Sequence, residues 1–314
     1  MMNASDESPR PTFVVHDYFL ETAFEIRFQG LLRHAWQERS WHVIAAIPGS
    51  GKSLGIADLV LQAGSYKDTW GITHFPIVAI RAPKNGGKEL ALGMAFSAVF
   101  GLVPTMAWYV RRAWLVQALA TAHVECIIID DAQDLDITHL AFLKEITDNL
   151  AAPPYERQVG LCLVTAHSGN VMPLKETFSR PDTLWRQFRR RLDTERPFCI
   201  VQGHTEEEVR SILAAFEDMY RNQLPDLHLC RWTKPIFTWL THQNLDPDGS
   251  GRVAMDHLTR LLTSTLRQTY EQGATDVDAS ILQATAELMI LRRDEIASIE
   301  GPPSPPPIEI QEVK

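Results

Sequence analysis

The sequence predicts an α/β fold in which helices flank a five-stranded parallel sheet, followed by a small all-α domain. Short apolar runs recur between residues 41 and 203, and helical patterns separate them. Continuous apolar runs of this length are typical of parallel strands that are buried on both faces. After Gly203 the strand pattern stops, and only helical patterns continue to about Arg293.

The same patterns divide the 314 residues into four parts. We expect residues 1–17 to be disordered because they are polar, and residues 18–203 to form the α/β domain. Residues 204–295 should form the helical domain, since Thr205 is a suitable helix cap and is followed by acidic residues. The Pro-rich residues 296–314 cannot build a core, so they should form a disordered tail or a short peptide that a partner binds.

Each element has its own signal. Apolar residues at helical spacing predict helices over residues 18–39 and 51–62. The expected strands are WHVIAAI (41–47), FPIVAIRAP (75–83), VECIIIDD (124–131), VGLCLVTAH (159–167) and PFCIVQG (197–203). The uncharged residues 90–110 are long enough to span a bilayer. However, Gly101 and Pro104 predict a helix end and a loop, so we expect a buried helix up to about Phe100, a turn, and a second helix from about Ala107 rather than a membrane span.

The segment AAIPGSGKS, residues 45–53, follows the first strand and precedes a helix. This order is typical of a phosphate-binding loop, in which glycines let backbone N–H groups surround phosphate oxygens. We expect Lys52 to reach the β- and γ-phosphates of ATP, and Ser53 to bind Mg²⁺ through its hydroxyl. The other expected nucleotide-binding residues are Pro48, Gly49, Ser50 and Gly51. Ala46 replaces the usual first glycine, at a strand exit where a methyl group is often tolerated.

Two acids end the third strand and would complete this site. Asp130 should bind Mg²⁺ through water, and Asp131 should orient or deprotonate the attacking water. Glu is commoner at the second position and Asp is one methylene shorter, so we expect slow or conditional hydrolysis. Without the phosphate loop, a pair of strand-end caps would be the simpler interpretation. Thr165, at the end of the fourth strand, is the candidate sensor of the attacking water, although a strand-end threonine is often only a cap.

Arginines follow in two places. Arg189, Arg190 and Arg191 precede the fifth strand, where an arginine can project into a neighbouring subunit as a finger that stabilises transition-state charge. A solvated basic face is the alternative for part of this cluster. Arg252 lies at a helix start after a glycine turn and should fold back onto the nucleotide. The same segment fits part of a calcium loop, but His257 stands where a bidentate Glu is required.

Charge and cysteine content exclude some classes of protein. The formal net charge is −9, whereas a protein that coats nucleic acid is normally basic, so any DNA contact must come from a local patch. The four cysteines form no Cys-x-x-Cys pair, which favours reduced core thiols of a cytosolic protein over a zinc site. The acidic, polar N-terminus is not a signal peptide.

In this order, the features resemble those of the AAA+ ATPases, and among them the transposition regulators of the TnsC/TniB type, which serve Tn7-like and CRISPR-associated transposons. The segments that carry the resemblance are FLETAFE, IPGSGKS, IRAPKNGGKELALGMAFSAVFG, IIIDDAQDL, FRRRL and GSGR, within residues 18–265. The chain departs from the family pattern at Ala46, at Asp131 and in the TAH strand end.

The resemblance implies a P-loop AAA+ domain with a helical lid, which binds ATP and Mg²⁺ in the bacterial cytoplasm. It implies a homo-oligomer, as a hexameric ring or a helical filament, that assembles on double-stranded DNA and acts in DNA transposition and recombination. The expected partners are a transposase and a target-selection protein of the TniQ/TnsD type. In this family the residues after the second strand contact DNA, which points to Arg81, Lys84 and Lys88; an ordinary surface loop is the alternative.

Three other functions fit parts of the pattern. A helicase loader or replication initiator shares the AAA+ pattern, but no helix-turn-helix module is evident after the helical domain. A small-molecule phosphotransferase would need neither Asp131 nor an intersubunit arginine. A signalling or secretion-associated NTPase would bind protein only, and salt-sensitive, ATP-dependent binding to random duplex DNA would exclude it.

Overall fold

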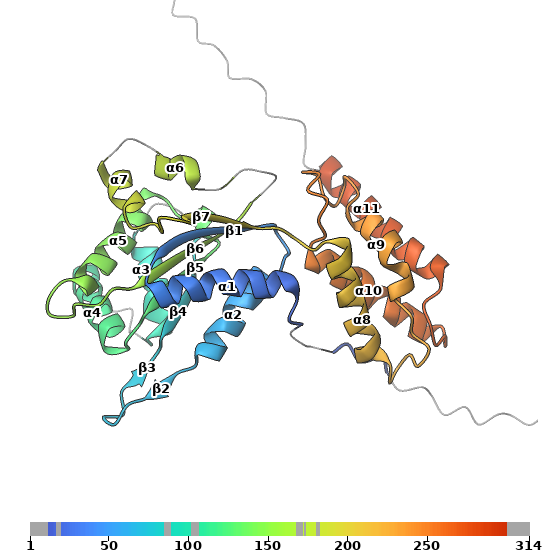
Figure 1. Ribbon diagram of the computed structural model, residues 1–314, viewed down its shortest axis with the longest axis horizontal. Coiled ribbons are helices and arrows are strands. Elements are labelled where there is room, and N and C mark those ends of the chain that lie inside the picture. The colour runs from blue at the N-terminus through green and yellow to red at the C-terminus, as the bar shows by residue number, and fades with distance from the viewer. Residues whose placement is uncertain are drawn as a thin grey trace, which may run out of the picture. The chain divides into compact units, whose positions relative to one another are not determined.

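The computed structural model describes residues 12–16, 20–84, 89–101, 107–167, 172, 174–179 and 183–299 of the chain (Figure 1). The chain divides into two compact units. The sheet unit consists of Asp17–Ile212 and Arg252–Asp256, and the helical unit consists of Met1–His16, Leu213–Gly251 and His257–Lys314. We expected the boundary between residues 203 and 204. The division instead falls between Ile212 and Leu213, inside the helix Glu206–Tyr220, and the short segment Arg252–Asp256 of the predicted helical region belongs to the sheet unit.

The sheet unit is built around five parallel strands, as predicted. They are β1 (Trp41–Ala46), β4 (Ile77–Arg81), β5 (Cys126–Asp130), β6 (Gly160–Ala166) and β7 (Phe198–Val201). Their order is β4-β5-β6-β1-β7, and every pair of neighbours is parallel. At the centre, Ile44 lies opposite Val164 on one side and Cys199 on the other. Parallel neighbours require crossover connections, and here helices provide them.

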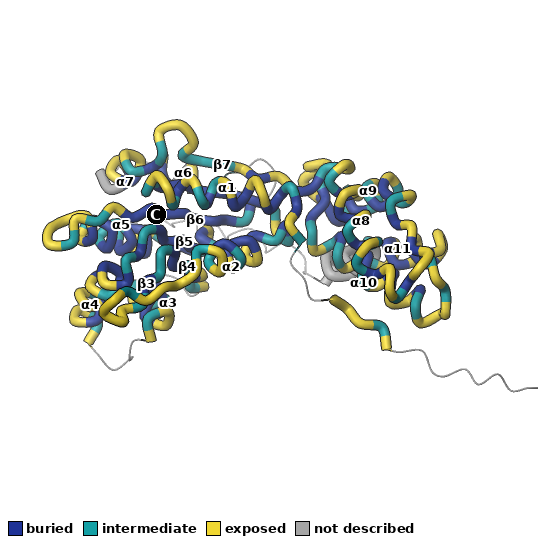
Figure 2. The backbone as a smooth tube through the Cα atoms, turned by 60° about the horizontal axis from the view of Figure 1, so that its bottom comes forward, coloured by how far each residue is buried: buried dark blue, intermediate teal, exposed yellow. Residues whose placement is uncertain are grey.

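Helices cover both faces of this sheet. They are α1 (Ala23–Glu38), α2 (Lys52–Ala63), α3 (Glu89–Val99), α4 (Trp108–Thr121), η1 (Ala132–Asp134), α5 (Ile137–Ala151), α6 (Lys175–Ser179) and α7 (Thr183–Arg189). One buried cluster joins Phe28 of α1 to Ile44 and Ile128, and a second joins Phe96 of α3 to Ile129. Strands β1 and β5 are buried along their whole length as a result (Figure 2).

The first helix is fixed near both ends. At its start Thr22 Oγ1 accepts a hydrogen bond from the Glu25 N–H at 3.2 Å, which is an N-cap contact. Near its end the backbone approaches β6 so closely that a Cβ on Gly160 would lie 2.5 Å from the Ala35 carbonyl oxygen. Only glycine allows this approach, which seats α1 on the amino end of β6.

The uncharged segment is broken where the sequence predicts. Helix α3 ends at Val99 and α4 begins at Trp108, and residues 102–106 between them lie outside the described residues. Within the part of the chain that the structure describes, no helix is both long and apolar enough to cross a bilayer.

A small antiparallel hairpin of β2 (Tyr66–Lys67) and β3 (Thr73–His74) was not predicted. Asp68 closes its turn, because Oδ1 of this carboxylate accepts the N–H groups of Trp70 and Ile72, both at 2.9 Å. Strands of two residues are too short to produce the alternation by which a strand is recognised in a sequence.

The helical unit contains most of α8 (Glu206–Tyr220), η2 (Cys230–Trp232), α9 (Thr233–Leu240), most of α10 (Met255–Glu271) and α11 (Ala279–Ile299). We expected residues 1–17 to be disordered, but residues 12–16 pack on this unit. The Phe13 ring contacts Tyr220 and Tyr270, with a centroid distance of 5.5 Å in each case. A single phenylalanine in a polar segment produces no periodic signal, so this aromatic contact could not be predicted.

The segment that resembled a calcium loop is a turn closed by Asp246. The Asp246 carboxylate accepts the N–H groups of Ser250 and Gly251 at 3.0 and 2.8 Å. Gly249 and Gly251 have positive φ values of 61° and 62°, which the turn requires. The carboxylate that would be the first calcium ligand therefore holds the turn itself.

Candidate nucleotide-binding site

The carboxyl ends of the central strands bring three predicted positions together at one edge of the sheet. The phosphate loop leaves β1 after Ala46, Asp130 ends β5, and Thr165 is the penultimate residue of β6. Strand β6 lies between β1 and β5, so the three positions are neighbours. Ligands of open α/β sheets bind outside this edge.

Two glycines and a buried lysine define the phosphate loop. Gly49 and Gly51 have φ values of 71° and 100°, in the region that favours glycine. Lys52 is 7% exposed, and its ammonium donates hydrogen bonds to the carbonyl oxygens of Ala46 (3.3 Å) and Ile47 (3.0 Å). Burial lowers the pKa of Lys52, while three nearby carboxylates act in the opposite direction. Phosphate oxygens could replace the two carbonyls as acceptors of this ammonium.

The other two predicted residues of the loop support its shape or line its surface. Ser50 is buried, and its hydroxyl donates a hydrogen bond to the Ile47 carbonyl oxygen at 2.8 Å. Pro48 is exposed at the tip of the loop. The structure therefore gives Ser50 a role inside the loop rather than on its surface.

The residues at the end of β5 fit a magnesium ion. The Ser53 hydroxyl, in the first turn of α2, donates a hydrogen bond to Asp130 Oδ2 at 2.5 Å. The other carboxylate oxygen of Asp130 accepts the Asp131 N–H at 3.0 Å, which fixes its orientation. A hydroxyl beside a carboxylate is a suitable set of oxygen donors for Mg²⁺, which adds phosphate oxygens and waters. The structure thus brings together both residues that the sequence assigned to the metal.

Asp131 is bound to Arg81, although separate roles were predicted for these two residues. Asp131 adopts a left-handed conformation with φ of 54°, and its Oδ2 accepts a hydrogen bond from Arg81 Nε at 2.6 Å. Its Oδ1 accepts a longer one from Gln133 at 3.3 Å. Gln133 in turn accepts the Ala166 N–H at 3.0 Å and so links β5 to β6. The predicted catalytic base and a predicted DNA-binding residue therefore form one ion pair.

Thr165 has a polar atom that the surrounding protein does not satisfy. The residue is fully buried, and among the described residues its Oγ1 has no hydrogen-bond partner. A buried hydroxyl without a partner is destabilising by about 1–3 kcal/mol. It lies opposite Ala45 of β1, immediately before the phosphate loop. This position fits the predicted role of a residue that bonds to a ligand-bound water.

The arginine cluster divides into one fixed and two exposed side chains. Arg191 donates to Thr147 Oγ1 at 3.2 Å, pairs with Asp148, and lies over the Trp41 ring at 5.2 Å. The side chains of Arg189 and Arg190 are exposed, and neither is paired within the described part of the chain. Of the three predicted fingers, the structure thus ties Arg191 to its own subunit and leaves two available.

A segment that the sequence placed in the helical domain contacts the phosphate loop. The Asp256 N–H donates a hydrogen bond to the Gly49 carbonyl oxygen at 2.9 Å. A Cβ on Gly49 would overlap the Asp256 carboxylate, so glycine is required here for space as well as for φ. We did not predict Asp256 as a site residue; the only signal was its position four residues, about one helical turn, after Arg252.

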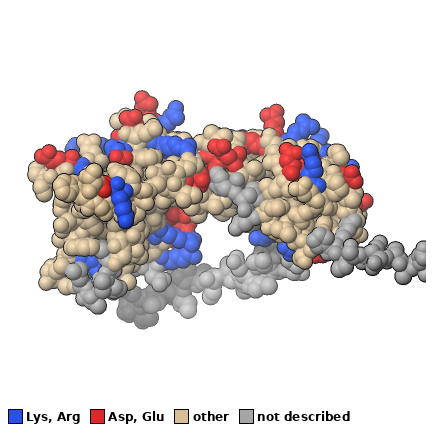
Figure 3. Space-filling model, turned by 90° about the horizontal axis from the view of Figure 1, so that it is seen from below, with Lys and Arg blue, Asp and Glu red and all other residues tan. Residues whose placement is uncertain are grey.

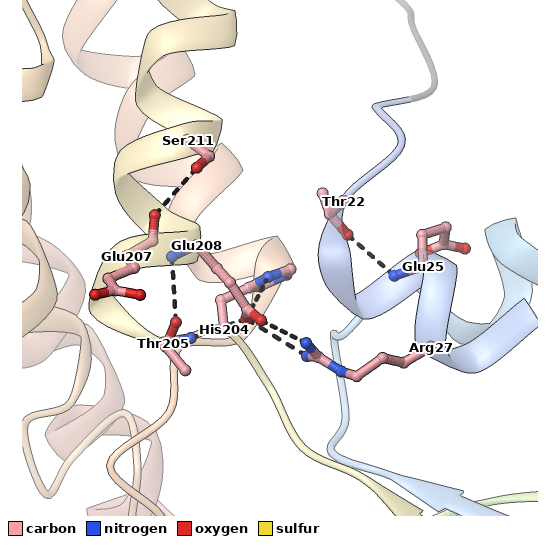
Figure 4. Close-up of polar contacts among 8 residues, drawn as sticks. All are labelled: Thr22, Glu25, Arg27, His204, Thr205, Glu207, Glu208 and Ser211. Atoms are coloured by element: carbon pink, nitrogen blue, oxygen red, sulfur yellow. Dashed lines mark hydrogen bonds and ion pairs between the residues drawn. The ribbon is translucent and has the colours of Figure 1, made fainter. Parts of the chain in front are cut away.

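Arg252 itself lines a cavity of about 790 Å³ in the sheet unit, together with residues of α1, β7 and the segment after β7. In its wall Arg27 forms an ion pair with Glu208 at 2.5 Å (Figure 4). Glu208 also accepts the Thr205 N–H at 3.0 Å, which closes the first turn of α8. The proposed contact of Arg252 with the nucleotide stays a prediction.

Two titratable residues of the sheet unit, Glu25 and His204, are buried (Figure 4). Burial, and then the charge of Asp58, raise the pKa of Glu25 to about 7. A Cβ on Gly51 would lie 3.6 Å from Glu25 Oε2, so this carboxyl group borders the phosphate loop. Burial lowers the pKa of His204 to about 4. Neither residue was predicted from the sequence, because both pKa shifts result from burial in the folded protein.

The raised pKa of Glu25 predicts a pH-dependent stability that Glu25→Gln removes. Between the ordinary value of 4.5 and about 7, the folded protein holds more proton on Glu25 than the unfolded chain does. Stability therefore falls as pH rises through this window, by roughly 3 kcal/mol. Urea unfolding at pH 5 and pH 8 measures this effect. Relative to the parent, Glu25→Gln should have a higher free energy of unfolding at pH 8 than at pH 5. Glu38→Gln, exposed on the same helix, is the control, and equal behaviour of both variants would contradict the prediction.

The three residues predicted to contact DNA differ in their surroundings. Arg81 is exposed and paired with Asp131, Lys84 is exposed, and Lys88 lies outside the described residues. On the face that Figure 3 shows, basic and acidic groups are interspersed. A DNA contact through Arg81 and Lys84 would come from a few local residues.

Comparison with known proteins agrees with this geometry. Residues 35–169 match the family model described as an AAA domain. This range contains the phosphate loop, the acid-ended strand and Thr165. The chain therefore contains an ATPase domain of the AAA+ P-loop fold. No curated protein matches the chain.

Solved structures share the fold at low sequence identity. The Aeropyrum pernix ORC2 protein, in ADPNP–ADP complexes, is 12% identical with a TM-score of 0.54, over 83% of this chain and 66% of that one. Cdc6p from Pyrobaculum aerophilum is 14% identical with a TM-score of 0.59, over 85% and 67%. The Aeropyrum pernix ORC1 protein in complex with DNA is 13% identical with a TM-score of 0.54, over 86% and 66%. The chain thus spans about two thirds of the length of these proteins.

Proposed function

We propose that this ATPase assembles in an ATP-dependent manner as a homo-oligomer on duplex DNA. The observation that carries the proposal is the position of the exposed pair Arg189 and Arg190 at the end of the sheet opposite the phosphate loop. Arg191, next in the chain, packs on Trp41 at the start of β1, whereas the loop leaves β1 after Ala46.

The length of β1 separates the arginines from the phosphate loop of their own subunit. Its six residues span roughly 17 Å at about 3.3 Å per residue. An arginine side chain cannot bridge that distance around a packed sheet. Arg189 or Arg190 can therefore stabilise a phosphate only in a neighbouring subunit. Such a head-to-tail contact makes a ring if it closes and a helical filament if it does not.

The residues of the site have complementary roles in hydrolysis. Ser53 and Asp130 would hold Mg²⁺, which would supply positive charge to offset that of the phosphates. Lys52 would neutralise phosphate charge from within the loop. Asp131 would accept the proton of the attacking water, and the Thr165 hydroxyl would hold that water in line.

The pair of Arg81 and Asp131 supports a link between DNA and hydrolysis. While Arg81 holds Oδ2 of Asp131, this carboxylate is oriented toward the arginine and not toward a water. A DNA phosphate that binds Arg81 would compete with Asp131 for the same guanidinium. Contact with DNA would then release the base, which agrees with the conditional hydrolysis expected from the sequence.

Arg81→Gln should therefore raise hydrolysis in the absence of DNA by at least about fivefold and abolish its stimulation by DNA. Steady-state phosphate release with and without random duplex DNA measures both effects. Arg221→Gln is the matched control, because Arg221 forms an exposed ion pair with Asp218 in the helical unit. Unchanged basal activity with full stimulation would disprove the coupling.

Within this class of function, we propose that the protein regulates DNA transposition by bridging a target-selection protein and a transposase. The resemblance to TnsC/TniB regulators in residues 18–265 supports this role. The shared fold of the ORC and Cdc6 proteins keeps replication initiation or helicase loading as the alternative.

Electron microscopy with random duplex DNA and a non-hydrolysable ATP analogue tests the assembly, and rings or filaments that require both are expected. Salt-sensitive binding in the presence of the analogue would accompany them. Monomers under all conditions would contradict the proposal. Co-sedimentation of the assembled complex with a TniQ/TnsD-like selector and a transposase would then separate transposition from replication.

A further inference from the structure

Three side chains with metal-binding atoms meet at the end of the sheet opposite the phosphate loop. They are His34 on α1, His42 on β1 and Asp193, which follows α7. Within the described part of the chain, one potential ligand atom from each lies within 4.8 Å of the other two. The three elements are far apart in sequence, so only the fold brings these residues together.

The hydrogen bonds of His42 leave the lone pair of its Nε2 directed toward the cluster, where it could bind a metal ion. The residue is 1% exposed, and its Nδ1 lies 3.0 Å from the Arg196 carbonyl oxygen. A carbonyl accepts only, so Nδ1 carries the proton, and the lone pair is on Nε2. The Ser40 hydroxyl donates a hydrogen bond to this Nε2 at 2.7 Å. A metal-binding histidine usually donates its other N–H to a carbonyl in this way, and an ion at Nε2 would replace the hydrogen bond from Ser40.

Hydrogen bonds also fix the orientation of the Asp193 carboxylate. Its Oδ1 accepts the N–H groups of Glu195 and Arg196 at 2.9 and 2.6 Å. These hydrogen bonds lower the pKa of Asp193, so the carboxylate is charged. The other oxygen, Oδ2, lies 3.8 Å from His34 Nε2 and 3.9 Å from His42 Nε2. One oxygen is thus fixed by the backbone, and the other is presented to both imidazoles.

The distances suit a cation between these atoms better than direct contact. Both exceed the upper limit of about 3.2 Å for a hydrogen bond between nitrogen and oxygen. Ligands about 2.1 Å from a tetrahedral ion are about 3.4 Å apart, so each of these nitrogen–oxygen distances would shorten by about 0.5 Å. The two histidine nitrogens, which lie within 4.8 Å of each other, would also have to approach to about 3.4 Å. His34 can make this shift, because its side chain is 46% exposed. It also lines the cavity of about 790 Å³, which gives an ion access from solvent.

We propose that His34, His42 and Asp193 bind a divalent transition-metal ion, with Zn²⁺ as the best match. Two imidazoles and one carboxylate are a ligand set that Zn²⁺ prefers and Mg²⁺ does not. Water or the Ser40 hydroxyl completes four-coordination. The ion ties the last turn of α1 to the start of β1 and to the segment before β7. It is separate from the nucleotide site at the other end of β1.

The test is titration of the full chain with Zn²⁺, and with Co²⁺ as a spectroscopic probe, in excess Mg²⁺ and without nucleotide. Excess Mg²⁺ is added to compete for the proposed site at Ser53 and Asp130. We expect one Zn²⁺ per chain, the visible absorption of tetrahedral Co²⁺, and binding weakened at least tenfold by His34→Ala and by Asp193→Asn. His228→Ala removes an exposed histidine of the helical unit and should bind as the parent does.

His34→Ala is the decisive variant, because its side chain is half-exposed and its loss leaves the fold intact. Asp193→Asn keeps an acceptor for the two N–H groups that Oδ1 receives, which separates loss of the ligand from loss of the turn. Equal Zn²⁺ affinity of both variants and the parent would overturn the proposal. A Co²⁺ spectrum that shows thiolate ligation would also overturn it. ATP hydrolysis with Mg²⁺ plays no part in these measurements, so failure here leaves the proposed function untouched.

Discussion

Lys52→Ala is expected to lower ATP hydrolysis by at least about 100-fold and to abolish ATP-dependent assembly on DNA. The lysine is the cationic side chain within the phosphate loop, and its ammonium lies against the carbonyls of Ala46 and Ile47. Without it, the charge of the triphosphate is opposed at the loop only by backbone N–H groups and the bound metal. Loss of nucleotide binding should then remove the contact through which subunits associate.

The fold should survive this change. Among the described residues, the Lys52 ammonium donates hydrogen bonds to two backbone carbonyls, and the Ala46 carbonyl also accepts the His167 N–H at 3.2 Å. Thermal unfolding of the variant should therefore stay close to that of the parent. Lys67→Ala removes an exposed lysine from β2 and is the matched control. If Lys52→Ala assembled on DNA as well as Lys67→Ala does, subunit association would not depend on binding of the triphosphate by Lys52, and the prediction would be wrong.

The double variant Arg189→Ala, Arg190→Ala is expected to bind ATP normally but to hydrolyse it about 100-fold more slowly or worse. Both side chains are exposed, so their removal costs little stability. Their absence leaves transition-state charge on the γ-phosphate of the neighbouring subunit uncompensated. Arg191→Ala should instead lower stability, because this arginine packs on Trp41 and pairs with Asp148. Phosphate release, nucleotide affinity and urea unfolding separate the two outcomes.

A mixing experiment decides whether the exposed arginines act between subunits. Asp131→Asn subunits bind ATP and retain Arg189 and Arg190, but they lack the base. The double arginine variant retains the base. Each is inactive alone, whereas in an equal mixture about one site in four combines an intact base with an intact finger from its neighbour. Recovery of activity in the mixture is expected; a mixture as inactive as its components would place the arginines in their own site.

The parts of the fold that depend on local sequence could be predicted. Strands β1, β4, β5, β6 and β7 fall within the apolar runs, because a strand buried on both faces needs a continuous apolar segment. The end of α3 at Val99, two residues before Gly101, could also be predicted. The phosphate loop could be predicted too, since the spacing of its glycines specifies its geometry, and Asp130 could be predicted as the acid that ends an apolar strand.

The remainder depends on contacts between distant segments. No pattern in the sequence connects Asp256 to Gly49, or Arg81 to Asp131, because each pair is joined only when strands and loops are assembled. Glu25 reads as an ordinary surface residue of an amphipathic helix, and burial against α2 changes its pKa. Arg191 looks the same as Arg189 and Arg190 in the sequence, and only the position of Trp41 and Asp148 distinguishes it.

Because Arg252–Asp256 belong to the sheet unit, this unit limits which truncations and domain exchanges the protein tolerates. The catalytic half is not a continuous stretch that ends where its last strand does. A deletion after Ile212, or a fusion that exchanges everything downstream, would remove the backbone contact made with Gly49 at the same time. The two units must therefore be inherited as one piece, and swapping the helical half between relatives would also require a matching partner for that glycine.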